Sequence, residues 1–172
     1  EQLLPLAITK HLTIELQSSN PELLVWADQD RLSQILTNLL DNAIKYTPDG
    51  GQVSVELSVD THDMARIVIR DNGQGIPPDA LPKLFDPFFR VQQEERSQTK
   101  GLGLGLAIVK DLVDLHGGSI TVRSEVDQGT EFTFTLPLHS REPSPAGQLP
   151  AVRRTVLVVD DDPDICDLLR DR

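Results

Sequence analysis

Three polar side chains along one predicted helix could bind phosphate and a divalent cation. The segment 29–46 reads QDRLSQILTNLLDNAIKY, in which Asn38, Asn42 and Lys45 follow one another at intervals of three or four residues. At about 100° per residue, these side chains and Gln34 gather on one side of a helix. Amide oxygens and an ammonium group suit a hydrated Mg²⁺ ion and the phosphates attached to it. A solvated helix face could have the same composition, so the pattern alone leaves both interpretations open.

The opposite side of that helix is predicted to face the core. Asp28 precedes the helix and is a favoured N-cap residue. The apolar residues recur at intervals of three and four, which is typical of one buried stripe. They are Leu32, Ile35, Leu36, Leu39, Leu40, Ala43 and Ile44.

A second group of chemically useful residues follows a predicted strand. The segment 70–81 reads RDNGQGIPPDAL, and Asp71 stands where the strand ends. Asp-Asn-Gly is also a common turn signature, so a simple turn is the alternative interpretation. Gly73 and Gly75 flank one residue and could let a flat ligand approach the backbone. The Asp71 carboxylate could accept a hydrogen bond from an exocyclic amino group such as that of adenine.

A third group is a glycine-rich turn that leads into a helix. The segment 99–112 reads TKGLGLGLAIVKDL, with Gly101, Gly103 and Gly105 spaced two apart. The first turn of a helix offers unpaired N–H groups and the positive end of the helix dipole, and phosphates bind well there. A flexible surface loop explains such glycines about as well.

The remaining sequence predicts the elements that must position these groups. Residues 52–59 and 65–71 alternate apolar and polar side chains, which indicates strands with one buried face. Further strands are predicted at 12–16, 23–27, 119–125 and 131–138, and a helix is predicted at about 103–115, ending at Gly117–Gly118.

The overall charge argues against two classes of partner. The chain has 172 residues, of which 38% are hydrophobic, and a formal net charge of −11 at pH 7. Nucleic acid and anionic membrane surfaces would repel it at long range, so we expect no nucleic acid and no direct membrane contact. Cys166 is the one cysteine, and no apolar run approaches the roughly 18 residues that span a bilayer. We therefore expect a cytoplasmic segment, although its parent protein could be membrane-anchored.

The order of the motifs resembles a known family. The segments NLLDNAIKYT (38–47), DNGQGI (71–76), LFDPFFR (84–90), GLGLGLAIVKDLVDLHGG (101–118) and GTEFTF (129–134) resemble the N, G1, F, G2 and G3 boxes of the sensor histidine kinase catalytic domain. That family belongs to the superfamily of gyrase-, Hsp90- and MutL-like ATP-binding domains. The resemblance covers about residues 3–138. It implies an α/β two-layer sandwich of the Bergerat type, in which helices back one face of a mixed sheet.

The resemblance implies a binding site for ATP and Mg²⁺. Asn42 would hold the Mg²⁺ with Asn38 beside it, while Lys45 and Tyr46 would reach the phosphates and the nucleotide. Among these, Asn38, Asn42 and Lys45 would form the catalytic group.

The same resemblance places the base and the lid. Asp71 would take the adenine amino group, and Thr130 would close the base pocket. Residues 90–100 would form a mobile lid in which Arg90, Arg96 or Lys100 could contact the γ-phosphate. The other nucleotide-binding residues that it implies are Gly73, Gly75, Ile76, Gly101, Leu102, Gly103, Leu104 and Gly105.

Two positions depart from related patterns. The common form of the glycine motif has threonine where this chain has Leu102, so a hydroxyl contact to phosphate is missing. Hydrolysing relatives have a glutamate at the position of Asn38, where it activates water. An amide cannot accept a proton at neutral pH, so transfer of the phosphoryl group is expected rather than efficient hydrolysis.

The phospho-accepting histidine is not expected in this segment. His11, His62, His116 and His139 do not stand in the family's acceptor pattern and are interpreted as surface or packing residues. The expected function is therefore transfer of the ATP γ-phosphoryl group to a histidine on a separate dimerisation domain, in two-component signalling. A superfamily ATPase and a non-catalytic nucleotide-binding signalling module are the alternatives.

The C-terminal part is predicted to be a separate unit. Prolines and small polar residues make 139–154 a linker between a catalytic domain at 1–138 and a short segment at 155–172. That segment, TVLVVDDDPDICDLLRDR, resembles the first strand and helix of a response-regulator receiver domain. Asp160 and Asp161 would be its acidic Mg²⁺ pair, in an incomplete site. The resemblance implies a hybrid kinase as the parent, with a receiver domain as a partner, and no core partner for the fragment in this chain.

Overall fold

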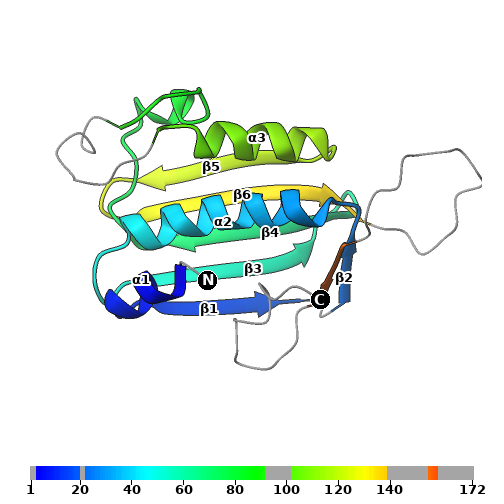
Figure 1. The fold of residues 1–172 in the computed structure, drawn as a ribbon, viewed down its shortest axis with the longest axis horizontal. Helices are drawn as coiled ribbons and strands as arrows, with labels where there is room; N and C mark the ends of the chain where they lie inside the picture. Colours follow the sequence, from blue (N-terminus) through cyan, green and yellow to red (C-terminus); the bar gives the residue numbers. More distant parts are fainter. Residues whose placement is uncertain (1–2, 20–21, 92–101, 139–154, 159–172) are drawn as a thin grey trace, which may run out of the picture.

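The computed structural model describes residues 3–19, 22–91, 102–138 and 155–158. Its main sheet has five strands in the order β1-β3-β4-β6-β5 (Figure 1). β1 is parallel to β3, while the other neighbouring pairs are antiparallel, so the sheet is mixed as predicted. The strands are β1 (Thr13–Ser18), β3 (Gln52–Val59), β4 (Met64–Asp71), β5 (Ser119–Glu125) and β6 (Gly129–Pro137).

Helices cover one face of this sheet. α2 (Gln29–Tyr46) and α3 (Gly105–Leu115) lie side by side on that face in opposite directions, and the short α1 (Leu3–Thr9) lies near the end of α2 (Figure 1). A single 3₁₀ turn, η1 (Leu81–Lys83), precedes α3. The arrangement confirms the predicted two-layer α/β sandwich.

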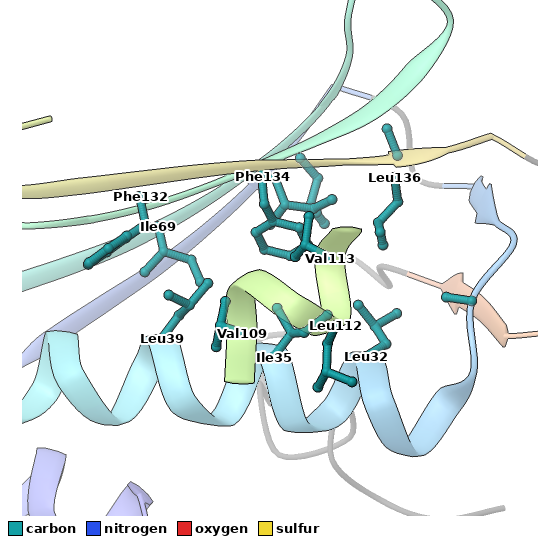
Figure 2. Close-up of a cluster of buried hydrophobic side chains, with 14 of the residues drawn as sticks. Leu32, Ile35, Leu39, Ile69, Val109, Leu112, Val113, Phe132, Phe134 and Leu136 are labelled. Carbon is teal, nitrogen blue, oxygen red and sulfur yellow. The ribbon is translucent and has the colours of Figure 1, made fainter. Parts of the chain in front are cut away.

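The core fills the space between the two helices and the sheet. Side chains of α2, α3, β4 and β6 point toward one another there (Figure 2). Leu39, Val109 and Phe134 are each 0% exposed. Burying each such side chain contributes about 1.5–3 kcal/mol, so this layer is the main source of stability that fixes α2 over the sheet.

Both ends of α2 are held by side chains. At the N-terminus, the Asp28 carboxylate accepts a hydrogen bond from the Arg31 N–H at 3.1 Å, which confirms the predicted N-cap. At the C-terminus, the Lys10 ammonium donates to the carbonyl oxygens of Ile44 at 2.8 Å, Lys45 at 3.0 Å, and Thr47. A cation at this end is also favoured by the helix dipole.

His116 joins the beginning of α2 to the end of α3. Its Nδ1 lies 2.7 Å from the Leu112 carbonyl oxygen, and its Nε2 accepts from the Asp28 N–H at 3.1 Å. Because Nε2 is the acceptor, the proton is on Nδ1, which donates to the carbonyl. His116 is thus a packing residue, in agreement with its interpretation from the sequence.

Residues 155–158 differ from expectation. They form β7 (Thr155–Val158), which pairs antiparallel with β2 (Glu22–Val25) in a separate two-stranded sheet. An apolar strand was predicted here, but the fragment was expected to have no core partner in this chain, and its pairing with β2 was not predicted. The unpaired N–H and C=O groups along an edge strand accept such an addition, which accounts for the difference. The linker 139–154, together with Asp160 and Asp161, lies outside the described residues.

Most predicted boundaries agree with the structure, and two elements were not predicted. α2, β3 and β5 have the predicted bounds, while α3 begins at Gly105 rather than at about residue 103. The sequence analysis assigned no helix to α1, whose seven residues include a proline at position 5. It also missed η1, because a turn of three residues leaves no periodic pattern.

We predict that Lys10→Met destabilises the domain by about 1–2 kcal/mol, because carbonyl oxygens at the end of α2 lose their donor. Urea unfolding followed by circular dichroism measures the change. Lys83→Met, which removes an exposed lysine on η1, serves as the matched control and should change the free energy of unfolding by less than about 0.5 kcal/mol. Equal stability of the two variants would contradict the proposed role of Lys10.

Candidate nucleotide-binding site

A cavity of about 590 Å³ lies beside the C-terminal half of α2. Its walls come from α2, the beginning of α3, the ends of β4 and β6, and the segment that joins β4 to α3. Thirteen of the residues predicted to bind nucleotide line it, which brings five separate sequence motifs to one place. They are Asn38, Asn42, Lys45, Tyr46, Asp71, Gly75, Ile76, Arg90, Leu102, Gly103, Leu104, Gly105 and Thr130. Gly73 does not line the cavity, and Arg96, Lys100 and Gly101 lie outside the described residues.

The carboxylate of Asp71 is buried at the end of β4. Asp71 is 8% exposed and is paired in register with Thr130 on β6. Its Oδ1 atom accepts hydrogen bonds from the Gly73 N–H at 2.8 Å and the Thr130 N–H at 3.3 Å. Burial raises the pKa of this carboxyl above its ordinary value, and the two backbone hydrogen bonds oppose the rise. The backbone therefore fixes the direction of an acceptor that faces the cavity.

The structure explains why glycines follow Asp71, and the explanation differs from the one in the sequence analysis. A Cβ atom at Gly73 would lie 2.5 Å from the Tyr46 carbonyl oxygen, and one at Gly75 would lie 2.0 Å from the Glu125 carbonyl oxygen. Gly75 also has a φ angle of +68°, which favours glycine. These glycines let the loop pack against α2 and the end of β5, so the space they leave is filled by the protein itself.

The polar ridge of α2 faces the other part of the cavity. Asn38 Nδ2 donates to the Gln34 carbonyl oxygen at 2.9 Å, and Asn38 Oδ1 would lie 3.0 Å from a Cβ atom at Gly105. Among the described residues, the Asn42 side chain has no hydrogen-bond partner. From Asn38 to Tyr46 the helix rises about 12 Å, so the ridge extends along the cavity from the beginning of α3 to the loop after Asp71.

Lys45 and Tyr46 form a pair at the end of this ridge. The Lys45 ammonium donates to the Tyr46 hydroxyl at 2.6 Å and lies 4.5 Å from the centre of the Tyr46 ring. A positive charge over an aromatic face is a favourable contact, and it holds the ammonium at the cavity wall. The pair places one cation beside the amides of Asn38 and Asn42.

The beginning of α3 supplies backbone donors. The first hydrogen bond of the helix runs from the Ile108 N–H to the Leu104 carbonyl, so the preceding N–H groups of the first turn have no acceptor within the helix. Gly103 has a φ angle of +69°, and its carbonyl accepts from the Phe88 N–H at 2.9 Å. Leu102, which stands where threonine is common, is 78% exposed at the rim.

Several lining residues were missed by sequence reasoning. Apolar side chains complete the walls, and Ser124 lies just behind them on β5, where its hydroxyl contacts Thr130. A signal for Ser124 was available, because it interrupts the helix-facing series of β5 after Ile120 and Val122. Lining residues not predicted are Leu6, Asp41, Ala43, Gln74, Leu84, Phe89, Val91, Leu106, Ile108 and Phe132.

A second, more open hollow of about 630 Å³ lies over the sheet face that the helices leave uncovered. Its charged groups include Arg70 and Glu131, which form an ion pair across neighbouring strands at 2.5 Å. None of the α2 or α3 residues lines it. The amides of Asn38 and Asn42, which form the amide ridge of α2, and the N-terminus of α3 thus line only the first cavity. The first cavity is therefore the better candidate for binding.

Comparison with known proteins identifies the family. Residues 27–140 match the family described as histidine kinase-, DNA gyrase B- and HSP90-like ATPase. The solved structure of the mycobacterial sensor histidine kinase MprB shares 34% sequence identity with a TM-score of 0.68, over 79% of this chain and 90% of that chain. The chain belongs to the ATP-binding catalytic domains of sensor histidine kinases.

Two relatives are much longer than the region that they share with this chain. The chain is 39% identical over 141 residues to the sensor histidine kinase RppB of Synechocystis, covering 81% of this chain and 31% of RppB. It is 41% identical over 133 residues to WalK of Bacillus subtilis, covering 76% of this chain and 22% of WalK. The chain thus spans less than a third of the length of these curated relatives.

One similar structure contains a nucleotide analogue. Full-length ShkA in complex with AMPPNP has a TM-score of 0.70 and 36% identity to the kinase domain, over 83% of this chain and 29% of ShkA. Within the described residues of the kinase domain, no helix is long and apolar enough to cross a membrane.

We predict that Asp71→Asn weakens ATP binding about tenfold or more, because an amide offers a neutral, weaker acceptor in place of a carboxylate. Isothermal titration calorimetry with the Mg²⁺ complex of ATP gives the dissociation constants. Asp79→Asn, at an exposed aspartate in the same loop region, is the control and should bind like the unaltered domain. An Asp71→Asn variant with unchanged affinity would contradict this geometry.

The raised pKa of Asp71 predicts a pH dependence of stability. The folded state holds this proton more tightly than the unfolded state, so ionising Asp71 costs stability as pH rises above the ordinary aspartate pKa of about 3.9. Asp71→Asn removes that cost. Its free energy of unfolding should therefore improve relative to the unaltered domain as pH rises from about 4, measured by urea unfolding at each pH. Parallel curves would show that burial does not perturb this carboxyl.

Proposed function

We propose that the kinase domain binds ATP with Mg²⁺ in the cavity beside α2 and transfers the γ-phosphoryl group to a histidine of a separate dimerisation domain. The observation that carries the proposal is the meeting of three chemistries in one cavity: the buried carboxylate of Asp71, the amide ridge of α2 and the free N–H groups at the beginning of α3. The family match supports ATP as the ligand.

The adenine base is proposed to lie against Asp71. Its carboxylate accepts from the amino group, and Thr130 closes the pocket beside it. Ile76 and the backbone at Gly75 line the same part of the cavity. The Gly73 and Thr130 N–H groups both donate to Asp71 Oδ1. The second carboxylate oxygen, Oδ2, is therefore proposed to accept from the ligand.

The phosphates are proposed to lie between α2 and α3. The N–H groups that follow Gly103 and Gly105 bind phosphate oxygens, and Lys45 supplies a positive charge next to Tyr46. Leu102 and Leu104 contribute backbone contacts here, as does Gly101. From the lid, Arg90 lines the cavity and Lys100 is proposed to approach the γ-phosphate.

The amides of Asn42 and Asn38 fit a magnesium ion. Amide oxygens and water are suitable ligands for Mg²⁺, and the Asn42 side chain lines the cavity without a hydrogen-bond partner in the described part of the chain. Asn38 Nδ2 is committed to the Gln34 carbonyl, so its Oδ1 is the atom that remains for an ion or its water. When bound, the ion offsets negative charge on the phosphates.

Phosphoryl transfer suits this site better than hydrolysis. Asn38 stands where a general base would be needed, and an amide cannot accept the proton of an attacking water. A histidine nitrogen already has a lone pair, so it can form the bond to phosphorus while the bond to the β–γ bridging oxygen breaks and ADP leaves. The residues of the domain then act by positioning and charge stabilisation.

We further propose a three-part organisation, with this domain at 1–138, a linker at 139–154 and the beginning of a receiver domain at 155–172. The support is the sequence resemblance of the last part, with the acidic pair Asp160 and Asp161 after an apolar strand. Under this proposal the parent is a hybrid kinase and a receiver domain is its second partner.

Mixing the chain with Mg²⁺, γ-labelled ATP and a purified dimerisation domain of the sensor kinase type tests the transfer. We expect acid-labile, base-stable label on a histidine of the second protein. Asn42→Ala should reduce the initial rate by about 10- to 100-fold, because its amide is proposed to position the ion. Gln17→Ala, an exposed amide on β1, should leave the rate unchanged. Release of inorganic phosphate without labelled histidine would overturn the proposal in favour of an ATPase.

A further inference from the structure

Ser124 lies at the centre of a hydrogen-bond network behind the base end of the cavity. Its Oγ atom is 2.8 Å from the Ile76 nitrogen, 2.8 Å from the Gly129 carbonyl oxygen and 2.9 Å from Thr130 Oγ1. Three segments that are distant in sequence meet at this one hydroxyl: the loop after β4, the end of β5 and the beginning of β6.

The donors and acceptors around Ser124 fix where its proton lies. The Gly129 carbonyl can only accept, so the single Ser124 proton is donated to it. The Ile76 N–H can only donate, so Ser124 accepts from it. The remaining lone pair of Ser124 must therefore accept from Thr130, whose hydroxyl becomes the donor in that contact.

The consequence reaches the cavity through Thr130. Thr130 is 7% exposed and lines the cavity together with Asp71. Because its proton is committed to Ser124, the Thr130 hydroxyl presents only lone pairs to a ligand. The ionised Asp71 carboxylate also presents only acceptors. The side chains of Thr130 and Asp71 thus both present only hydrogen-bond acceptors to a ligand.

We propose that Ser124 is a positioning residue that sets the base specificity of the site. Because Thr130 donates its hydroxyl proton to Ser124, this end of the cavity favours a purine with an amino group at C6. A purine with a carbonyl at C6 binds less favourably there. The two acceptors face a donating amino group at C6 in the first case and a carbonyl oxygen, which is a third acceptor, in the second. This inference rests on the proposed function, because it concerns the nucleotide bound in the same cavity.

The chain offers a matched control on the same two strands. Ser119 and Thr135 are also register partners on β5 and β6, and their hydroxyl oxygens lie 3.1 Å apart. This pair lies on the sheet face opposite the helices, away from the cavity residues. Removing the Ser119 hydroxyl therefore repeats the chemical change without touching the site.

The test compares the affinities for ATP and inosine triphosphate, which carries a 6-oxo group in place of the amino group, by calorimetry with Mg²⁺. In Ser124→Ala, the Thr130 hydroxyl is released and can rotate to donate to the 6-oxo group. We expect the preference for ATP to shrink by about fivefold, the worth of one hydrogen bond. Ser119→Ala should leave the preference unchanged.

A second substitution separates specificity from structure. In a Thr130→Val background no hydroxyl remains to be oriented, so adding Ser124→Ala should no longer change the ratio of the two affinities. Equal weakening of both nucleotides by Ser124→Ala would overturn the inference, because a merely structural role predicts that result. If Ser124→Ala does not fold, Ser124→Cys is the second variant, because its thiol is only a weak hydrogen-bond acceptor for Thr130. An unaltered ratio of affinities there also overturns the inference.

The outcomes distinguish this inference from the proposed function. If the unaltered domain binds neither nucleotide, the proposed function fails. If it prefers ATP and both Ser124 variants keep that preference, only the role of Ser124 fails.

Discussion

Burial of one face of α2 against the sheet determines where the polar groups of the site can lie. Leu32, Ile35 and Leu39 are fixed in the core, so the side chains on the other side of the helix have a fixed direction. Asn38 and Asn42 therefore lie on the side of the helix that lines the cavity, and a hydrogen bond to the Gln34 carbonyl further orients Asn38. The hydrophobic layer that stabilises the fold is also the element that orients the amide ridge.

The second fixed point is the end of β4. Asp71 belongs to a strand in the middle of the sheet, with β3 on one side and β6 on the other, so its backbone cannot move independently. Hydrogen bonds from Gly73 and Thr130 orient the carboxylate. A buried carboxylate is unfavourable for folding, and its cost is met by the packing around it. Stability alone therefore does not account for such a group.

Sequence reasoning succeeded where the signal was local and periodic. α2 carries an N-cap residue and a regular apolar stripe, and its bounds agreed with the structure. The glycine motif and the strand end were predicted to belong to one site, and Asp71, Gly103 and Gly105 line the same cavity. α1 was missed because a helix of seven residues gives too short a pattern, and the capping role of Lys10 depends on contacts 34 to 37 residues away.

Other features depended on tertiary packing that the sequence does not display. The glycines after Asp71 were interpreted as space for a ligand, whereas at Gly73 and Gly75 carbonyl groups of the protein occupy that space. Ser124 interrupts an apolar face of β5, which the sequence shows. Its hydrogen bonds with Ile76 and Gly129 could not be predicted, because these residues are brought together only by the fold. The lid residues 92–100 and the acidic pair near the C-terminus lie outside the described residues, so their roles stay predictions.

The contact of Lys10 with α2 has a mechanical consequence. Lys10 follows α1 directly, and its ammonium bonds the carbonyls of Ile44 and Lys45. A displacement of α1 is therefore coupled to the last turn of α2. Lys45 and Tyr46 of that turn line the cavity. The residue that follows α1 is in this way linked directly to a wall of the candidate cavity.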